Sequence, residues 1–129
     1  MTRVYLPLAA GDLQALLQQE QLPAPRLAFL VTDAQRRADP QADEEELEYD
    51  ALTEAGEVQL GPRRIVVAAD VELHPADGAA SPAQLAEPVP LRRVVSCHVS
   101  AAGAAPDDEL LWYDATELPI LLTELLAPG

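Results

Sequence analysis

The sequence contains no lysine, no asparagine and a single cysteine among its 129 residues. One cysteine excludes an internal disulfide bond, and an unpaired thiol is typical of a reducing compartment such as the cytoplasm. All eight basic residues are arginine, which together with the many alanines and prolines indicates a GC-rich coding sequence. The choice of arginine over lysine therefore carries little functional information.

Long apolar runs are also missing. No stretch approaches the roughly 20 apolar residues that cross a bilayer, and the first residues read as a strand and not as a signal peptide. We therefore expect a cytoplasmic protein that has no membrane-spanning segment. Aromatic residues are few, with one Trp, one Phe and three Tyr, so the core has to be built from Leu, Val and Ala.

Basic residues are outnumbered by acidic ones, 8 against 22, and the formal net charge is −14 at pH 7. Such an excess opposes binding to nucleic acid phosphates or to an anionic membrane through general electrostatics, and we expect direct contact with neither. It permits a basic protein partner. The competing interpretation is that the acidic residues only keep an alanine-rich chain soluble.

The run from Arg63 to Val71 is the only one whose centre is apolar at every residue, which predicts a central strand covered on both faces. Asp39 followed by Pro40 predicts the start of an acidic helix, and Gly56 predicts its end. Periodicity predicts the other elements: strands at Arg3–Leu8, Arg26–Thr32, Val89–Val99 and Leu110–Tyr113, and helices at Asp12–Gln19 and at the leucines 118–125. Thr116 is the predicted N-cap of the last helix. Together these elements predict a single α+β domain over residues 1–129, with two layers, a mixed β-sheet of about five strands and about three helices.

Four stretches of this sequence are similar to a known family. They are RVYLP from Arg3, DEEELEYDAL from Asp43, RRIVVAADV from Arg63, and ELLWYDATELPILL near the C-terminus. The chain resembles a family of uncharacterised actinobacterial proteins, known as a domain of unknown function. The resemblance implies an intact fold over nearly the whole chain and a GC-rich source. It implies no catalytic residue, because the family has no established activity.

The acidic helix is the first candidate surface. Glu44 and Glu48 are four residues apart and so share a helix face, with Glu45 beside them, where carboxylates can bind a basic partner or a divalent cation. The alternation of Asp residues around a glycine that is typical of a calcium loop is missing, so we expect no metal and no cofactor. Trp112 and Tyr113 alternate on the last predicted strand, and an outward Trp112 beside acidic residues suits a protein interface. The competing interpretations are a solvated face neutralised by arginines, and a tryptophan packed in the core.

Two arginine pairs are the second candidate. Arg63 and Arg64 precede one predicted strand, and Arg92 and Arg93 precede the next. If those strands run parallel, four guanidiniums gather at one sheet edge, where they can bind a phosphate or carboxylate. If the strands run antiparallel, the pairs separate. The alternative is that the arginines pair with the acidic helix.

Cys97 and His98 are the third candidate. Neighbouring residues on a strand point to opposite faces, so these two side chains cannot act together as nucleophile and base. Alternation places Cys97 on one face with Val95 and Val99, and we favour it as a small core residue. His74 lies in a predicted loop. The sequence carries no Gly-x-Ser-x-Gly, no phosphate-binding glycine loop, no Cys-x-x-Cys and no His-x-x-x-His.

These observations favour a non-enzymatic cytoplasmic module that binds a basic partner, or a second copy of itself, through its acidic surface and an adjoining hydrophobic edge. The alternative is a small enzyme, or an anion-binding or other ligand-binding protein, whose site lies near Arg64, Arg93 and His98. That alternative requires the three side chains to converge. A third hypothesis, in which the acid imitates a nucleic acid backbone, requires carboxylates spread over a surface and not confined to one helix.

Overall fold

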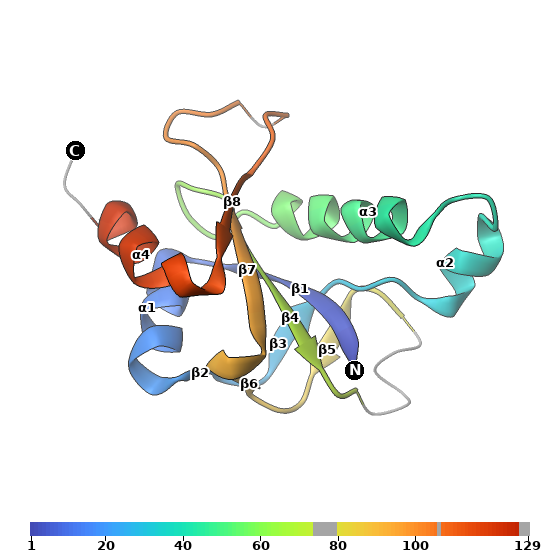
Figure 1. Ribbon diagram of the computed structural model, residues 1–129, viewed down its shortest axis with the longest axis horizontal. Helices are drawn as coiled ribbons and strands as arrows, with labels where there is room; N and C mark the ends of the chain where they lie inside the picture. Colours follow the sequence, from blue (N-terminus) through green and yellow to red (C-terminus); the bar gives the residue numbers. More distant parts are fainter. Residues whose placement is uncertain (74–79, 106, 127–129) are drawn as a thin grey trace.

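The computed structural model describes residues 1–73, 80–105 and 107–126 (Figure 1). The main sheet has the strand order β1-β4-β7-β8, with bounds Thr2–Leu8, Ile65–Val71, Val94–Val99 and Leu111–Asp114. Two separate ribbons pair β2 (Gln21–Leu22) with β6 (Val89–Pro90) and β3 (Arg26–Ala28) with β5 (Ala83–Leu85). The α-helices of the described residues are α1 (Ala10–Gln19), α2 (Asp33–Ala38), α3 (Glu44–Glu57) and α4 (Leu118–Leu126), and 3₁₀ turns η2 and η3 span Leu91–Arg93 and Ala115–Glu117.

The α+β fold is confirmed, but two details of the predicted sheet are wrong. Every strand pair in the described residues is antiparallel, so the main sheet is not mixed. Helices between strands permit parallel pairing without requiring it. The run Arg26–Thr32 also does not become a full fifth strand, because beyond β3 it meets β1 through one bridge, in which Tyr5 and Phe29 exchange backbone hydrogen bonds of 2.8 and 2.9 Å.

β4 lies inside the main sheet and is buried on both faces, as its unbroken apolar run predicts. Ile65 and Val67 belong to the larger apolar cluster on one face, whereas Val66 and Ala68 belong to a smaller cluster on the other face. Side chains on successive residues of a strand point to opposite faces, so a strand that is apolar at every residue needs two covers. Both covers are present.

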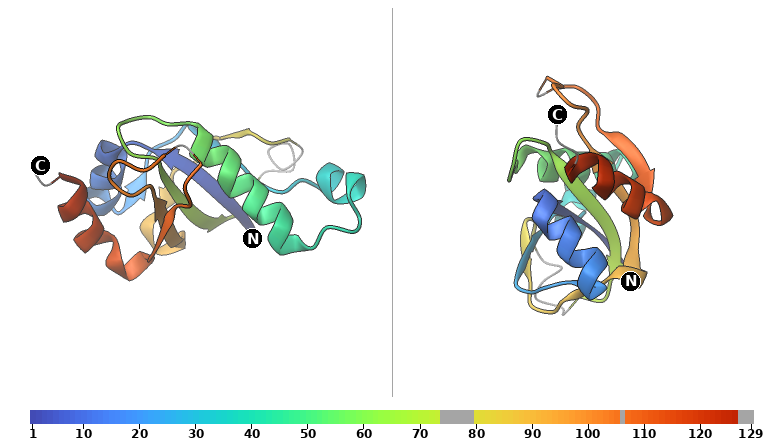
Figure 2. Two further views of the ribbon diagram at one scale, coloured as in Figure 1. Left: turned by 90° about the horizontal axis from the view of Figure 1, so that it is seen from above. Right: turned by 90° about the vertical axis from the view of Figure 1, so that its left-hand side faces the viewer.

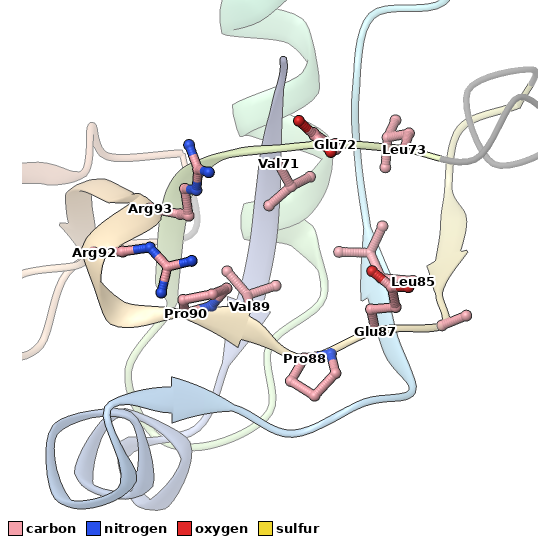
Figure 3. Close-up of a pocket in the computed structure, with 11 residues that line it drawn as sticks. Val71, Glu72, Leu73, Leu85, Glu87, Pro88, Val89, Pro90, Arg92 and Arg93 are labelled. Carbon is pink, nitrogen blue, oxygen red and sulfur yellow. The ribbon is translucent and has the colours of Figure 1, made fainter.

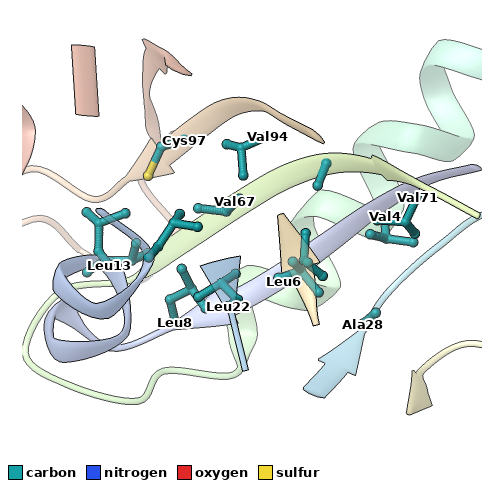
Figure 4. Packing of buried hydrophobic residues seen from close by; sticks show 14 of the residues in the cluster. Val4, Leu6, Leu8, Leu13, Leu22, Ala28, Val67, Val71, Val94 and Cys97 are labelled. Carbon is teal, nitrogen blue, oxygen red and sulfur yellow. The ribbon is translucent and has the colours of Figure 1, made fainter. Parts of the chain in front are cut away.

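The larger cluster is covered by α1 and α4, which pack against each other (Figure 2). Figure 4 shows side chains of this cluster, among them Leu13 of α1 and Val67 of β4. Leu13 of α1 and the leucines 118 and 121 of α4 are buried, in agreement with the predicted helical spacing. The predicted N-cap of the last helix, Thr116, is wrong. The Asp114 carboxylate instead accepts the Thr116 N–H at 3.0 Å, which starts the 3₁₀ turn that leads into α4.

The smaller cluster is covered by α3, which packs on β1 and β4. The predicted cap at Asp39 is wrong, because the Asp43 carboxylate accepts the Glu46 N–H at 2.8 Å and so begins this helix. The preceding residues form the separate helix α2, whose N-cap is Thr32. Gly56 does not end α3 either, since it is a buried residue within the helix, which continues to Glu57.

β7 contains an irregularity that the alternating pattern does not predict. Ala68 pairs with Ser96, but Ala69 pairs with Val94, so the register skips Val95 as in a β-bulge. Val94 therefore packs in the larger cluster with Cys97, and the prediction that Val95 shares the Cys97 face is wrong. The predicted strand Val89–Val99 is also interrupted by η2.

Within the described residues, no helix combines the length and the hydropathy needed to span a membrane.

Candidate functional site

A groove of about 420 Å³ lies between α3 and the face of β7 and β8 that α3 leaves uncovered. We call it the α3–β8 groove. Its residues are Glu44, Glu45, Glu48, Tyr49 and Leu52 of α3; Arg3 and Tyr5 of β1; Ala68 of β4; Val95, Ser96 and His98 of β7; and Trp112 of β8. The groove exists because α3 packs on β1 and β4, at one side of the sheet.

The floor of the groove is formed by polar and aromatic side chains of β7 and β8. His98 pairs in register with Trp112, and its Nε2 atom lies 3.0 Å from Ser96 Oγ. Burial lowers the pKa of His98 below its ordinary value of 6.5, so the imidazole is neutral at pH 7. The floor therefore carries no positive charge at neutral pH.

The wall formed by α3 is acidic, and among the described residues only one of its carboxylates, that of Glu44, has an ion-pair partner. Arg36 donates to both oxygens of Glu44, with Nη2–Oε1 at 2.6 Å and Nε–Oε2 at 3.1 Å, and this contact lowers the pKa of Glu44. Glu45 and Glu48 form no ion pair within the part of the chain that the structure describes. The expected neutralisation of the acidic helix by several arginines is thus limited to Arg36.

Glu48 is the most enclosed of these acidic residues. Its Oε2 atom is buried and has no hydrogen-bond partner among the described residues. Burial, and after it a side-chain hydrogen bond with Glu48 and the charge of that carboxylate, raises the pKa of Tyr5 well above its ordinary range. Arg3 is already committed to Asp70, through contacts of 2.6 Å from Nε and 3.2 Å from Nη2. A buried carboxylate oxygen without a donor is unusual and requires an explanation.

Two aromatic side chains border the groove and are largely exposed. Trp112 has 61% of its surface accessible and Tyr49 has 57%. The structure therefore places Trp112 outside the core, on the same groove as Glu44, Glu45 and Glu48. Tyr49 was missed by the sequence reasoning, although it lies four residues after Glu45 and could have been assigned to the same helix face.

A second pocket of about 520 Å³ continues the groove and shares Tyr49, Leu52 and His98 with it. Its outer side is lined by the acidic residues 107–109. Arg64 also lines this pocket, but its Nη2 donates to the carbonyl oxygens of Ala105 at 3.3 Å and Asp108 at 2.9 Å. The second pocket is thus a neighbour of the groove, and both have acidic residues at their sides.

The two arginine pairs lie apart, because β4 and β7 are antiparallel. Arg63 donates from Nε to Ser100 O at 2.6 Å, beyond the C-terminal end of β7, whereas Arg92 and Arg93 precede the N-terminal end of that strand. A strand of this length spans about 16–20 Å at about 3.3 Å per residue. Arg64 and His98 line the second pocket but Arg93 lines a different one, so the convergence that the ligand-binding alternative requires is not met.

Arg92 and Arg93 line a small cavity of about 170 Å³ beside Val89 (Figure 3). The carboxylates of Glu72 and Glu87 line the same cavity, so acidic groups balance the two guanidinium charges there. Arg93 also donates from Nη1 to the sulfur of Met1 at 2.8 Å. The cavity has no clear preference for an anion.

Cys97 is fully buried in the larger apolar cluster, as expected, and burial raises its pKa to about 12. The thiol is therefore protonated at neutral pH and lies on the opposite face from His98. His74 lies outside the described residues. Among the residues that are described, no three His, Cys, Asp or Glu side chains are arranged to hold a metal ion.

Comparison with known proteins gives one match. The model of a family of unknown function (DUF6912) matches residues 2–106, which confirms the predicted resemblance to an uncharacterised domain family. No curated protein and no solved structure matches the chain. The matched region includes α3 and β7 and ends before β8, so it contains the acidic wall of the groove but not Trp112.

Proposed function

We propose that this chain, which belongs to the family of unknown function DUF6912, is a non-enzymatic interaction module that binds a basic segment of a partner protein. The family provides no activity to transfer, so the proposal rests on the groove. The binding surface is the α3–β8 groove together with the second pocket. The proposal includes the cytoplasmic location expected from the single unpaired cysteine.

The observation that carries this proposal is the shared position of the predicted contact residues. Glu44, Glu45 and Glu48 come from a helix and Trp112 from a strand far along the chain, yet all four line one groove. Carboxylates attract basic side chains over several ångströms, and an exposed indole can stack on them. A purely solubilising acidic surface would not require a tryptophan exposed beside it.

The charge balance of the groove favours a basic occupant over a second copy of the chain. The cations at its margins are already paired, Arg3 with Asp70 and Arg36 with Glu44, and Arg64 with backbone carbonyls. A second copy would bring a further net charge of −14. Like charges placed against each other weaken association, whereas a basic segment is attracted.

A pair of matched variants tests the proposal. The groove variant replaces Glu44, Glu45 and Glu48 by Gln; the control replaces Glu46 and Glu54 by Gln and Asp50 by Asn, on the same helix but outside the groove. Both remove the same formal charge. Each tagged protein is used to capture partners from lysate of its own organism at low and physiological salt, with mass spectrometry of the retained proteins.

We expect a basic partner that the wild type and the control variant retain and the groove variant loses. Equal retention by all three proteins would contradict the proposal. Equal loss by both variants would also contradict it, because binding would then depend on overall charge and not on the groove.

A further inference from the structure

We infer that the α3–β8 groove binds an arginine side chain of the partner, whose guanidinium stacks on Trp112 and donates hydrogen bonds to Glu48. The inference rests on the proposed function and specifies the ligand chemistry of the same site. Three observations support it: an oxygen of Glu48 without a hydrogen-bond donor among the described residues, the exposed indole of Trp112, and the groove that both residues line.

The acceptor is Oε2 of Glu48: Tyr5 interacts with the same carboxylate, but this oxygen is buried without a hydrogen-bond partner among the described residues. Burying a charged oxygen without a donor costs free energy, and a ligand that supplies the donor recovers it. Arg3, on which the charge of Glu48 acts, is held by Asp70 through two hydrogen bonds. A guanidinium of a partner can supply the donor that Oε2 lacks.

The aromatic surface is the indole of Trp112. Its position beside His98 follows from the direction in which the backbone N–H and C=O groups of each residue point within the sheet. The Ser100 N–H donates to Arg64 O at 2.9 Å, so the backbone hydrogen-bonding groups of Ser100 point toward β4. Alternate residues of a strand share this direction, so His98 also directs its backbone toward β4 and away from β8. His98 and Trp112 are then a non-hydrogen-bonded pair.

The hydrogen bonds of β8 lead to the same conclusion about this pair. The Asp114 N–H donates to Glu117 Oε1 at 3.0 Å and not to β7, so Trp112, two residues earlier, also turns its backbone away from β7. Side chains of non-hydrogen-bonded antiparallel pairs lie closest together. The exposed indole therefore lies directly beside the imidazole on the groove floor.

The composition of the groove favours arginine over lysine. A guanidinium is planar and weakly hydrated, so it can stack on an indole while its edge N–H groups reach a carboxylate, whereas an ammonium is a compact and strongly hydrated charge. Ala68, Val95 and Leu52 provide apolar surface for the methylene stem. The neutral His98 beside the indole adds no repulsion.

Trp112 makes the test direct, because it is the only tryptophan in the chain. Hexa-arginine and hexa-lysine peptides, which carry the same charge, are titrated into the full chain at physiological salt. Binding is measured by Trp112 fluorescence and independently by the anisotropy of a labelled peptide. We expect hexa-arginine to bind about tenfold more tightly than hexa-lysine and to change the emission of Trp112.

Two variants and one control identify the contacts. We expect Glu48→Gln to weaken hexa-arginine binding about tenfold, since it removes the charge but keeps the shape. We expect Trp112→Ala, at an exposed position, to abolish the preference for arginine in the anisotropy measurement. Glu46→Gln, on α3 but outside the groove, removes the same charge as Glu48→Gln and should leave binding within about twofold of wild type.

Equal binding of both peptides, or hexa-arginine binding that is insensitive to Glu48→Gln, would overturn the inference, as would no binding of either peptide. The proposed function is decided separately by the lysate capture. A salt-sensitive partner lost by the groove variant would keep that proposal even if the arginine preference is absent.

Discussion

The two faces of the main sheet are covered to different degrees. The helices α1 and α4 cover one face and α3 covers the other (Figure 2). The first two contribute leucines that complete the larger apolar cluster, whereas α3 contributes mainly Ala51 and Ala55. Leucine side chains reach far enough from a helix to fill the space above neighbouring strands. Alanine side chains are short, so a helix that packs through them covers only the strands directly beneath it. The first face stabilises the fold, and the incomplete cover of the second leaves exposed the surface for which we propose a binding role.

The charges of the two faces differ in the same way. Asp12 of α1 lies 3.4 Å from Arg26 in an ion pair, whereas Glu45 and Glu48, on the groove wall of α3, form no ion pair with any residue that the structure describes. Unpaired acidic residues raise the electrostatic energy of the free protein and can be compensated by a basic ligand. Incomplete packing and incomplete charge pairing thus occur on the same face, which supports a binding role for it.

The largest expected effect is a truncation on the closed face. Leu121→Ala removes a leucine that is 1% exposed and should lower the free energy of unfolding by about 2–5 kcal/mol. Ile120→Ala changes the adjacent residue of the same helix, which is 65% exposed, and should alter stability by less than about 0.5 kcal/mol. Urea denaturation measures both. Similar values for the two variants would show that α4 does not seal this face.

A smaller effect is expected at the start of the helix that covers the open face. Asp43→Ala removes the carboxylate that accepts the Glu46 N–H, and should lower the free energy of unfolding by about 1 kcal/mol. Asp39→Ala removes the residue that the sequence suggests as the cap, and we expect a change below about 0.5 kcal/mol. Chemical denaturation of both variants decides which aspartate caps α3, and a larger loss at Asp39 would contradict the structure.

Sequence alone predicts the parts of the fold that depend on local pattern. The apolar run at Arg63 to Val71 predicts a strand buried on both faces, and the spacing of the C-terminal leucines predicts the buried side of α4. The faces of β7 could not be predicted, because the bulge at Val95 arises from its pairing with β4. A pattern of alternation holds only while the register is unbroken.

The candidate site was predictable in its parts but not as an assembly. Helical spacing places Glu44 and Glu48 on one face, but only the packed sheet brings Trp112 opposite to them. The distance between the two arginine pairs depends on whether their strands run parallel or antiparallel. The sequences of the two strands do not determine this direction. Antiparallel pairing separates Arg64 from Arg93 and removes their shared site.

The open face should also tolerate an added methyl group better than the closed face. Gly56 lies within α3, and a Cβ there would meet its nearest neighbour, Leu110 Cδ1, at an ordinary contact distance of 3.6 Å. Gly56→Ala should therefore raise the free energy of unfolding by about 0.5–1 kcal/mol through the lower entropy of the unfolded chain and the higher helix propensity. Thermal unfolding measures the gain. A loss of stability would show that α3 packs more tightly than the structure indicates.

The smallest effect is a difference in how the two faces respond to pH. Burial lowers the pKa of His98 in the folded state below its ordinary value of 6.5, so the unfolded chain binds its proton first as the pH falls. The contribution of His98 is thus constant above about pH 6.5 and destabilises the folded state as the pH falls from there to the folded pKa. The closed face has no such response, because the pKa of Cys97 is raised to about 12.

We expect the free energy of unfolding of the wild type, relative to His98→Gln, to decrease between about pH 7.5 and pH 5.5. Parallel pH profiles for the two proteins would mean that water already reaches the imidazole, and the groove floor would then be as open as its acidic wall.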